Sequence, residues 1–486
     1  MGAMHNLWRL AAGAALAIGL AGAAIAAPPK VTAVAGEPTL ALASFDLKAL
    51  GFVVEEYFLA GDATSYKPVG PQGPDGKWQA AAAGTSPYVT RLVVVRPADP
   101  KRFNGTAAVE WLNVTPGQDI SPDWSYTHRE LMRSGYAYVG VSVQKVGIEG
   151  GQSMAGPGAG LKKMKPERYS GLSHPGDAFA FDIYSQAGRV VRGGAVLGPL
   201  KVKRMLALGE SQSAIFMTTY VNAIDPLDKV YDGFFVHSRF GGAPSVDAAR
   251  GPMQQAQGVR FRPDRRAPVM AVLAETDITS QGGWWTAEQP DDAKLRVWQI
   301  PGAAHADTYM LQVAANDSGQ APIEKLADLW KPTATTVVGR LAKPMNSGPQ
   351  HHYVAQAALA HLETWVRTGK APPSAPRVET TPGAASAPPT LVLDANGNTK
   401  GGIRTPWVDA PTAKLSGFGN SGSGFAFLFG TTEAYDAATL QRLYPGGKAD
   451  YLKAFDAALA KAVKAGYILP ADQNEARAVA AAMYPG

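Results

Sequence analysis

Cysteine is absent from all 486 residues of this sequence. The protein therefore has no disulfide bond, no cysteine-linked lipid anchor and no thiolate metal site. Its fold has to be stabilised by its hydrophobic core. Hydrophobic residues make up 46% of the chain, which is enough to bury a large core and argues against disorder.

Runs of like charge are also lacking. The chain has 46 Lys and Arg against 40 Asp and Glu, giving a net charge of +6, but the basic residues are spread along the sequence. Proteins that bind nucleic acids gather such residues into patches. We therefore expect no nucleic acid partner and interpret the small positive charge as favouring solubility.

One long apolar run occurs near the start, from Leu10 to Ala26, and Arg9 is the only firm positive charge before it. Its many alanines and glycines, and the small residues at its end, are typical of a secretory signal peptide cleaved next to Ala27 rather than of a membrane anchor. We expect residues 1–27 to be removed. The mature protein is then periplasmic or secreted and has no stable insertion in a membrane.

Strand-like and helix-like segments alternate along the rest of the chain, which predicts an α/β fold with a mostly parallel sheet and helices on both faces. Ser121 followed by Pro122 indicates the start of one helix. The strand-like segments are residues 52–59, 91–95, 106–113, 136–143, 233–237, 268–273 and 295–300, together with an apolar run before residue 209.

The segment Gly209-Glu210-Ser211-Gln212-Ser213 lies where this apolar run meets a helix-like pattern. It predicts a nucleophile elbow, a sharp strand-to-helix turn that exposes the serine hydroxyl. Ser213 replaces the second glycine usual in such turns, and a helix-capping serine is the alternative interpretation. Ser153 and Ser421 have similar neighbours but lie in loop-like sequence, so we favour Ser211.

A serine nucleophile needs a base and an acid, which follow it in the order serine, acid, histidine in this kind of fold. Asp277 follows a strand in AETDIT, and His305 follows the next strand in PGAAHAD, a spacing that fits one helix and one strand. Glu275 is the alternative acid, because a strand-like backbone puts both acids on one face. His237 is the competing base, but no suitable acid lies between Ser211 and it.

The oxyanion that forms during acyl transfer needs two N–H donors. We expect one from Gln212, directly after the serine, and the other from Val114, in the loop after the strand at residues 106–113. Four tryptophans are candidates for an apolar pocket, although core positions are the commoner role of such residues: Trp111, Trp124, Trp284 and Trp285.

The chain resembles a family of large bacterial α/β-hydrolase-domain proteins of esterase-like type. The resemblance rests on the segments VEWLNVT, RYSGLSHPGDAFAFDIYSQAGR, LALGESQSA, YDGFFVHSR, ETDI, AAHAD, NSGPQHHYV and GGIRTPWVD. It implies an α/β-hydrolase fold with Ser211, Asp277 and His305 as the catalytic triad, and Ser213 fits the family pattern. It does not identify a substrate, because members differ.

We expect an α/β-hydrolase core over residues 28–372, with lid-like segments near 145–172 and 306–350. A helical C-terminal extension over residues 373–486 is expected to pack on this core, although it begins with a Pro- and Ala-rich stretch that resembles a linker. The sequence gives no indication of the oligomeric state.

The function that follows is that of an exported serine hydrolase cleaving a small-molecule carboxylic ester through an acyl-enzyme, with no metal or cofactor. Two alternatives stay open. An amidase or lactonase would use the same triad with a different pocket, and a non-catalytic binding protein would keep the scaffold with a misassembled triad.

Overall fold

The computed structural model describes residues 28–153, 156–248, 255–337, 339–384, 387–422 and 424–485, and the predicted signal peptide at 1–27 lies outside them. Within this part of the chain, nine strands form one large sheet in the order β1-β2-β3-β5-β4-β8-β9-β12-β13. From β5 to β13 neighbouring strands run parallel, and β1 to β3 add an antiparallel edge. The order agrees with the predicted mostly parallel sheet.

The parallel strands are buried along almost their whole length. Strands of this kind read as continuous apolar runs, because helices cover both faces of the sheet. Their bounds are β4 (Thr106–Trp111), β5 (Ala137–Val141), β8 (Arg204–Glu210), β9 (Gly233–His237), β12 (Val269–Ala274) and β13 (Leu295–Ile300).

The antiparallel edge extends further than its sequence pattern indicated. β1 (Lys30–Val34) pairs with β2 (Phe52–Pro68), and β2 pairs with β3 (Ala80–Pro97) along its entire length, with an irregularity between Ser65 and Tyr66. The outer half of this hairpin is rich in alanine and glycine, which have low strand propensity. Pairing with a partner strand, which sequence patterns do not reveal, extends it.

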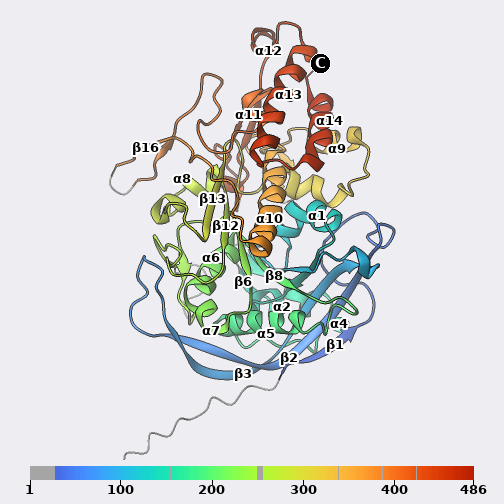
Figure 1. Cartoon of the computed structure of the whole chain (residues 1–486), viewed down its shortest axis with the longest axis vertical. Helices are drawn as coiled ribbons and strands as arrows, with labels where there is room; N and C mark the ends of the chain where they lie inside the picture. The colour runs from blue at the N-terminus through green and yellow to red at the C-terminus, as the bar shows by residue number, and fades with distance from the viewer. Residues whose placement is uncertain are drawn as a thin grey trace, which may run out of the picture.

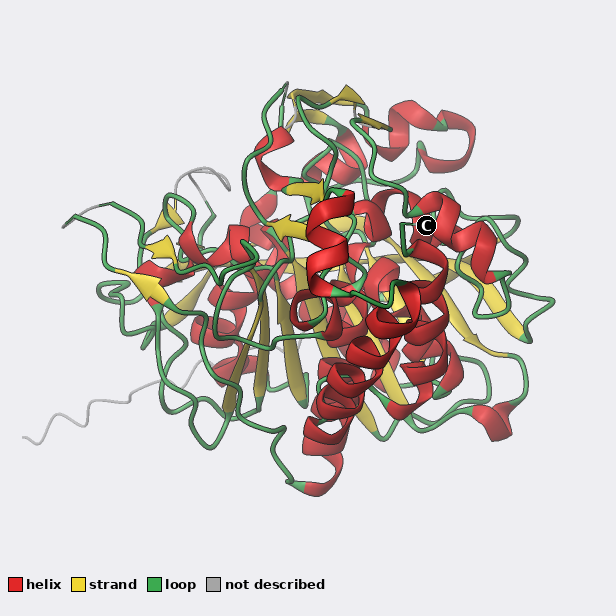
Figure 2. Cartoon of the chain, turned by 90° about the horizontal axis from the view of Figure 1, so that it is seen from above, coloured by secondary structure: helices red, strands yellow, loops and turns green. Residues whose placement is uncertain are grey.

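Helices cover both faces of the sheet, as Figure 2 shows from above. On one face, α5 (Ala180–Arg192) and α6 (Gln212–Thr219) pack into the same hydrophobic cluster as β4 and β9. On the other face, α1 (Pro122–Arg133) and α10 (Gln350–Thr368) share a cluster with β8 and β12. None of the described helices is both long enough and apolar enough to cross a bilayer.

Helix α1 begins at Pro122 as predicted, but Ser121 does not cap it through its side chain. The carboxylate of Glu110, buried in β4, instead accepts from the backbone N–H groups of Asp123 at 2.9 Å and Trp124 at 3.0 Å. A charge from a neighbouring strand thus satisfies donors that the first turn of a helix leaves free.

The C-terminal extension forms the upper part of the molecule in Figure 1, beyond the ends of β12 and β13. The stretch that resembles a linker lies along β13, where Trp298 donates to Pro373 O at 2.9 Å and Val378 N donates to Gln299 Oε1 at 2.8 Å. The larger elements after it are α11 (Pro406–Asp409), β18 (Ala413–Ser416), β19 (Thr431–Ala434), α12 (Ala437–Leu443), α13 (Lys448–Ala465) and α14 (Gln473–Met483).

The extension is attached to the core by apolar and ionic contacts. Tyr353 of α10 stacks on Trp407 of α11 at 5.3 Å, beside the buried face of α13. Asp472, at the N-cap position of α14, makes no side-chain capping hydrogen bond, and Glu475 lies in the first turn of the same helix. Both carboxylates pair with arginines of α1 instead, Asp472 with Arg133 and Glu475 with Arg129.

Candidate active site

Ser211 occupies a strained turn between β8 and α6. Its backbone has φ 58° and ψ −119°, a region that residues with a Cβ rarely adopt. Its N–H donates to the carbonyl of His237 on the neighbouring strand at 3.0 Å, which holds the turn against the sheet. A Cβ on Gly209 would lie 3.0 Å from Ser213 O, so the turn is tight enough to favour glycine there. These features are those of the predicted elbow.

The hydroxyl of Ser211 lies 2.8 Å from Nε2 of His305, and Nδ1 of the same ring lies 2.5 Å from Oδ1 of Asp277. Asp277 is fully buried and His305 is nearly so. With Asp277 ionised, the proton of the imidazole lies on Nδ1, and Nε2 is left to accept from the serine. The structure therefore brings together in one chain of hydrogen bonds the three residues that the sequence selected.

Glu275, the alternative acid, points elsewhere. Its carboxylate accepts from Gly302 N at 2.6 Å and from Gly417 N at 2.8 Å, and its burial raises the pKa of the group. Glu275 and Asp277 lie on a short helix, α8 (Glu275–Thr279), rather than on an extended strand. Residues two apart on a helix face in nearly opposite directions, which separates the two acids.

His237, the competing base, is buried one strand away from the elbow. Its Nδ1 lies 3.0 Å from Asp123 Oδ1 and its Nε2 lies 2.9 Å from His351 Nε2. Burial, with the neighbouring His351 and His305, holds the pKa of His237 well below its usual value. Both ring nitrogens thus face other side chains rather than Ser211.

The two residues expected to donate to the oxyanion are in contact. The N–H of Val114 donates to the side-chain Oε1 of Gln212 at 3.4 Å, a long hydrogen bond. Gln212 is the first residue of α6, where backbone N–H groups have no helical acceptor. A substrate oxygen that accepts from Val114 N–H would take the place of the Gln212 side chain.

Glu210 is a site residue that the sequence analysis did not select. Its Oε1 lies 3.6 Å from Nε2 of His305, and its Oε2 accepts from Asn113 Nδ2 at 3.4 Å. Burial is the largest of the causes that raise the pKa of Glu210 well above its usual value. Its position directly before the serine is the only sequence signal that points to it.

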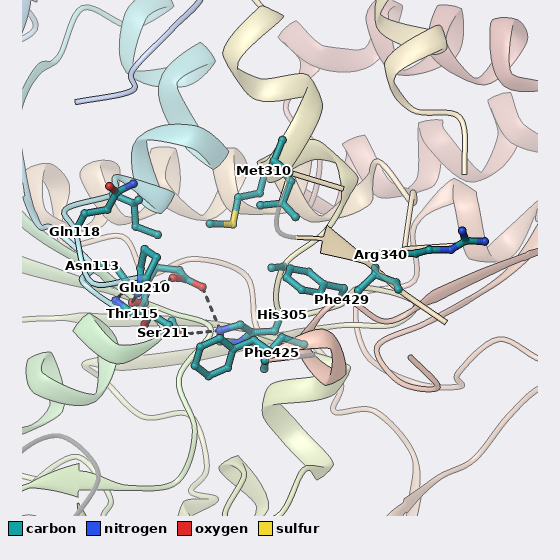
Figure 3. Close-up of a pocket in the computed structure, with 18 residues that line it drawn as sticks. Asn113, Thr115, Gln118, Glu210, Ser211, His305, Met310, Arg340, Phe425 and Phe429 are labelled. Atoms are coloured by element: carbon teal, nitrogen blue, oxygen red, sulfur yellow. Dashed lines mark hydrogen bonds and ion pairs between the residues drawn. The ribbon is translucent and has the colours of Figure 1, made fainter. Parts of the chain in front are cut away.

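Two pockets open beside Ser211. One has a volume of about 650 Å³, and the other has a volume of about 560 Å³. Figure 3 shows the larger one, with Ser211, Glu210 and His305 grouped at one end and Arg340 at the other. The four tryptophans considered as pocket candidates line neither pocket, and Trp111, Trp124 and Trp284 are buried in the core, which is the commoner role of such residues.

The segments expected to be lids differ in position. Residues 306–350 contribute Ala306, Met310, Leu311, Val337, Arg340 and Leu341 to the larger pocket. The described residues of 145–172 line neither pocket. Tyr169 and Leu172 from that segment pack near Phe58 and Val89 of the antiparallel edge instead.

Among the residues described, Asp317, His352 and Glu475 could offer ligand atoms to a metal within 4.8 Å of one another. Arg129 pairs with both carboxylates, so its guanidinium already offsets part of their charge. Asp317 also accepts from Tyr309 at 3.0 Å. We interpret this group as an ion-pair cluster that fixes α14 to α1.

Comparison with known proteins gives one family and several distant structures. The family model described as "Alpha/beta hydrolase domain" matches residues 25–478. No curated protein matches the chain.

The solved structures that match are similar at low identity. Esterase Est22 is 12% identical, with a TM-score of 0.28, over 48% of this chain and 67% of its own. A serine hydrolase without lid from Xanthomonas campestris is 14% identical, with a TM-score of 0.28, over 50% and 86%. A fungal esterase from Rhizomucor miehei is 12% identical, with a TM-score of 0.31, over 67% and 93%.

Proposed function

Because the chain belongs to the alpha/beta hydrolase domain family, we propose that it is a serine hydrolase that cleaves carboxylic esters through an acyl-enzyme. The family match confirms the predicted α/β-hydrolase fold and the resemblance to the α/β-hydrolase-domain family that the sequence showed. The match also supports a hydrolytic activity. A fold hosts many functions, so the choice of serine chemistry rests on the site itself.

The observation that carries the proposal is the continuous hydrogen-bond chain from Asp277 through His305 to Ser211, at 2.5 Å and 2.8 Å. In the proposed reaction, Ser211 Oγ attacks the ester carbonyl carbon while His305 Nε2 takes the hydroxyl proton. The negative carbonyl oxygen receives hydrogen bonds from the N–H groups of Gln212 and Val114.

Collapse of this intermediate breaks the bond to the alcohol, and His305 returns the proton to the departing oxygen. Water then loses a proton to His305 and attacks the acyl-enzyme, which releases the acid and restores the serine hydroxyl. Asp277 accepts the hydrogen bond from Nδ1–H throughout and stabilises the imidazolium that forms twice in the cycle.

A fluorophosphonate probe tests this proposal, because it labels only an activated serine. We expect labelling of the wild type and none of Ser211→Ala, together with a loss of ester turnover of about four to six orders of magnitude. Ser153→Ala is the matched control, since Ser153 has similar neighbours in the sequence but ends a short strand, β6 (Gly151–Ser153), and lines neither pocket beside Ser211. Turnover above a tenth of the wild-type rate in Ser211→Ala would refute the proposed nucleophile.

The probe, together with a comparison of substrates, separates the alternatives. A non-catalytic binding protein would resist the probe, whereas an amidase or lactonase would be labelled but would prefer amide or lactone substrates over esters of matched acyl group. The hydrogen-bonded serine favours catalysis over mere binding, because a misassembled triad would not place both nitrogens of His305 on their partners.

We also propose that the enzyme is exported, as the apolar run from Leu10 to Ala26 suggests. Fractionation of the native host and mass measurement of the purified protein test this. We expect a periplasmic or external protein that begins near residue 28, and a cytoplasmic protein that retains residues 1–27 would contradict it.

A further inference from the structure

The two pockets beside Ser211 meet at the nucleophile. Ser211 lines both, whereas His305, Glu210 and Met310 line only the larger one. Gln212 and Phe427 line only the smaller one. The reacting serine therefore stands where two separate spaces join.

The side chains between these spaces come mainly from the C-terminal extension. Phe425 and Leu428 of the extension, together with Thr115 of the loop after β4, line both pockets and so stand between them. Figure 3 places Phe425 next to Ser211 and His305, with Phe429 further along the larger pocket. Phe425, Leu428 and Phe429 belong to the loop between β18 and β19, more than a hundred residues after His305 in the chain.

Both ends of this loop are attached to the segments that carry the triad. At the first end, Gly417 N donates to Glu275 Oε2 at 2.8 Å, and Thr276 Oγ1 donates to Gly417 O at 2.7 Å. At the other end, Ala306 N, directly after His305, donates to Leu428 O at 3.2 Å. These hydrogen bonds therefore fix the position of the partition relative to both Asp277 and His305.

Chemistry assigns a half of the substrate to each pocket. The departing alcohol oxygen receives its proton from Nε2 of His305, so the alcohol group extends on the side that His305 lines. The acyl group is the other substituent of the carbonyl carbon that extends away from the oxyanion donors, so it takes the remaining space, which Gln212 and Phe427 line. The two volumes, about 650 Å³ and about 560 Å³, are each in the usual range for a small-molecule site.

We propose that the loop between β18 and β19 is the specificity element of the enzyme. It divides the site into an alcohol pocket and an acyl pocket, and so selects esters with apolar groups on both sides of the scissile bond. This inference rests on the proposed ester hydrolysis and makes the C-terminal extension part of the active site rather than a supporting appendage.

Two series of esters measured on the full-length protein test this division. One series keeps an acetyl group and lengthens the alcohol, and the other keeps the alcohol and lengthens the acyl chain. Met310→Ala should change the kcat/KM ratio of long to short substrates by about tenfold in the alcohol series only. Phe427→Ala should do so in the acyl series only, and Phe425→Ala should change both.

Leu393→Ala is the matched control, because Leu393 is an exposed apolar residue of the extension, 53% accessible, that lines neither pocket. It should leave both series unchanged, and circular dichroism should show every variant folded. The inference is overturned if Phe425→Ala changes one series or none. It is also overturned if Met310→Ala and Phe427→Ala change the same series or exchange theirs.

Ser211→Ala distinguishes this failure from a failure of the proposed function. If Ser211→Ala abolishes hydrolysis but the two series do not separate, the division is wrong and the hydrolase stands. If hydrolysis is absent in the wild type or survives in Ser211→Ala, both proposals are wrong.

Discussion

Replacing Asp277 with asparagine changes one oxygen of a carboxylate whose two oxygens both have partners. Oδ1 lies 2.5 Å from His305 Nδ1, and Oδ2 accepts from Ala274 N at 2.7 Å. Asparagine has the same shape but offers an NH₂ group in place of one oxygen. The protein therefore has to choose which partner loses its acceptor.

Each orientation of the asparagine has its own cost. If the NH₂ faces His305, it donates to Nδ1 and the ring proton moves to Nε2, which no longer accepts from Ser211. That wrong tautomer lowers kcat by about 10⁴ in serine proteases. If the NH₂ faces Ala274 N–H, a buried donor stays unsatisfied at a cost of about 1–3 kcal/mol.

The second orientation is therefore the minor one, populated by roughly one molecule in 5 to one in 150 at this cost. Even there, the neutral amide oxygen does not stabilise the imidazolium as a carboxylate does. We expect Asp277→Asn to lower kcat by about three to four orders of magnitude while the protein stays folded.

Glu275→Gln is the matched comparison, because it changes a neighbouring buried carboxylate in the same way. Its oxygens accept from Gly302 N and Gly417 N and do not face His305. One of these N–H groups loses its acceptor, which we expect to lower the free energy of unfolding by about 1–3 kcal/mol. Turnover should stay within about tenfold of the wild type, since the hydrogen-bond chain of the triad is intact.

The assay is the hydrolysis of one activated ester by purified variants, with circular dichroism to show that each is folded. The reasoning is refuted if Glu275→Gln loses more activity than Asp277→Asn. An Asp277→Asn protein with more than a tenth of the wild-type kcat would also refute it.

Three further predictions follow from buried contacts. The raised pKa of Glu210 means that its carboxyl stabilises the fold below its ordinary pKa of 4.5 and that this contribution is lost as the pH rises through the higher folded-state value. Glu210→Gln should flatten the fall in Tm above about pH 4.5, and an unchanged slope would contradict this. A Cβ on Gly417 would lie 2.7 Å from Glu275 Cβ and 2.8 Å from Thr276 N, so Gly417→Ala should lower both Tm and kcat. Gly171→Ala is the control, because open space surrounds Gly171 and neither quantity should fall. Equal behaviour of the two variants would contradict the attachment of the loop between β18 and β19 to the segment that carries the acid. Truncation after residue 372 should give an insoluble or inactive protein, because it exposes Tyr353 and removes the partition between the two pockets. A soluble, active product would show that the core folds and works without the extension.

The sequence by itself was sufficient to locate the parallel strands along the chain and to locate the elbow. Continuous apolar runs mark β4, β8 and β12 because such strands are buried on both faces, and this property is local. Gly209 and Ser211 are recognisable for the same reason, since the turn constrains residues that are adjacent in the chain. The selection of Asp277 and His305 drew on their place after successive strands, whose carboxyl ends lie at one edge of the sheet.

Tertiary structure decided what depends on partners far away in the sequence. The sequence favoured Asp277 but kept Glu275 as the alternative, because an extended backbone puts both acids on one face. The helical turn of α8 points the two side chains in different directions. Ser121 is a residue type typical of helix caps, but the carboxylate of Glu110 in β4 accepts the hydrogen bonds at the start of α1 instead.

The loop between β18 and β19 shows the same limit most clearly. Its glycine- and serine-rich sequence indicated an ordinary loop, yet Gly417 contacts Glu275 from 142 positions away, and Phe425 lies beside the nucleophile. Local sequence determines which backbone conformations are available to a segment. The packing of the whole chain decides which side chains the segment contacts, because burial and hydrogen bonding stabilise contacts regardless of their separation along the sequence.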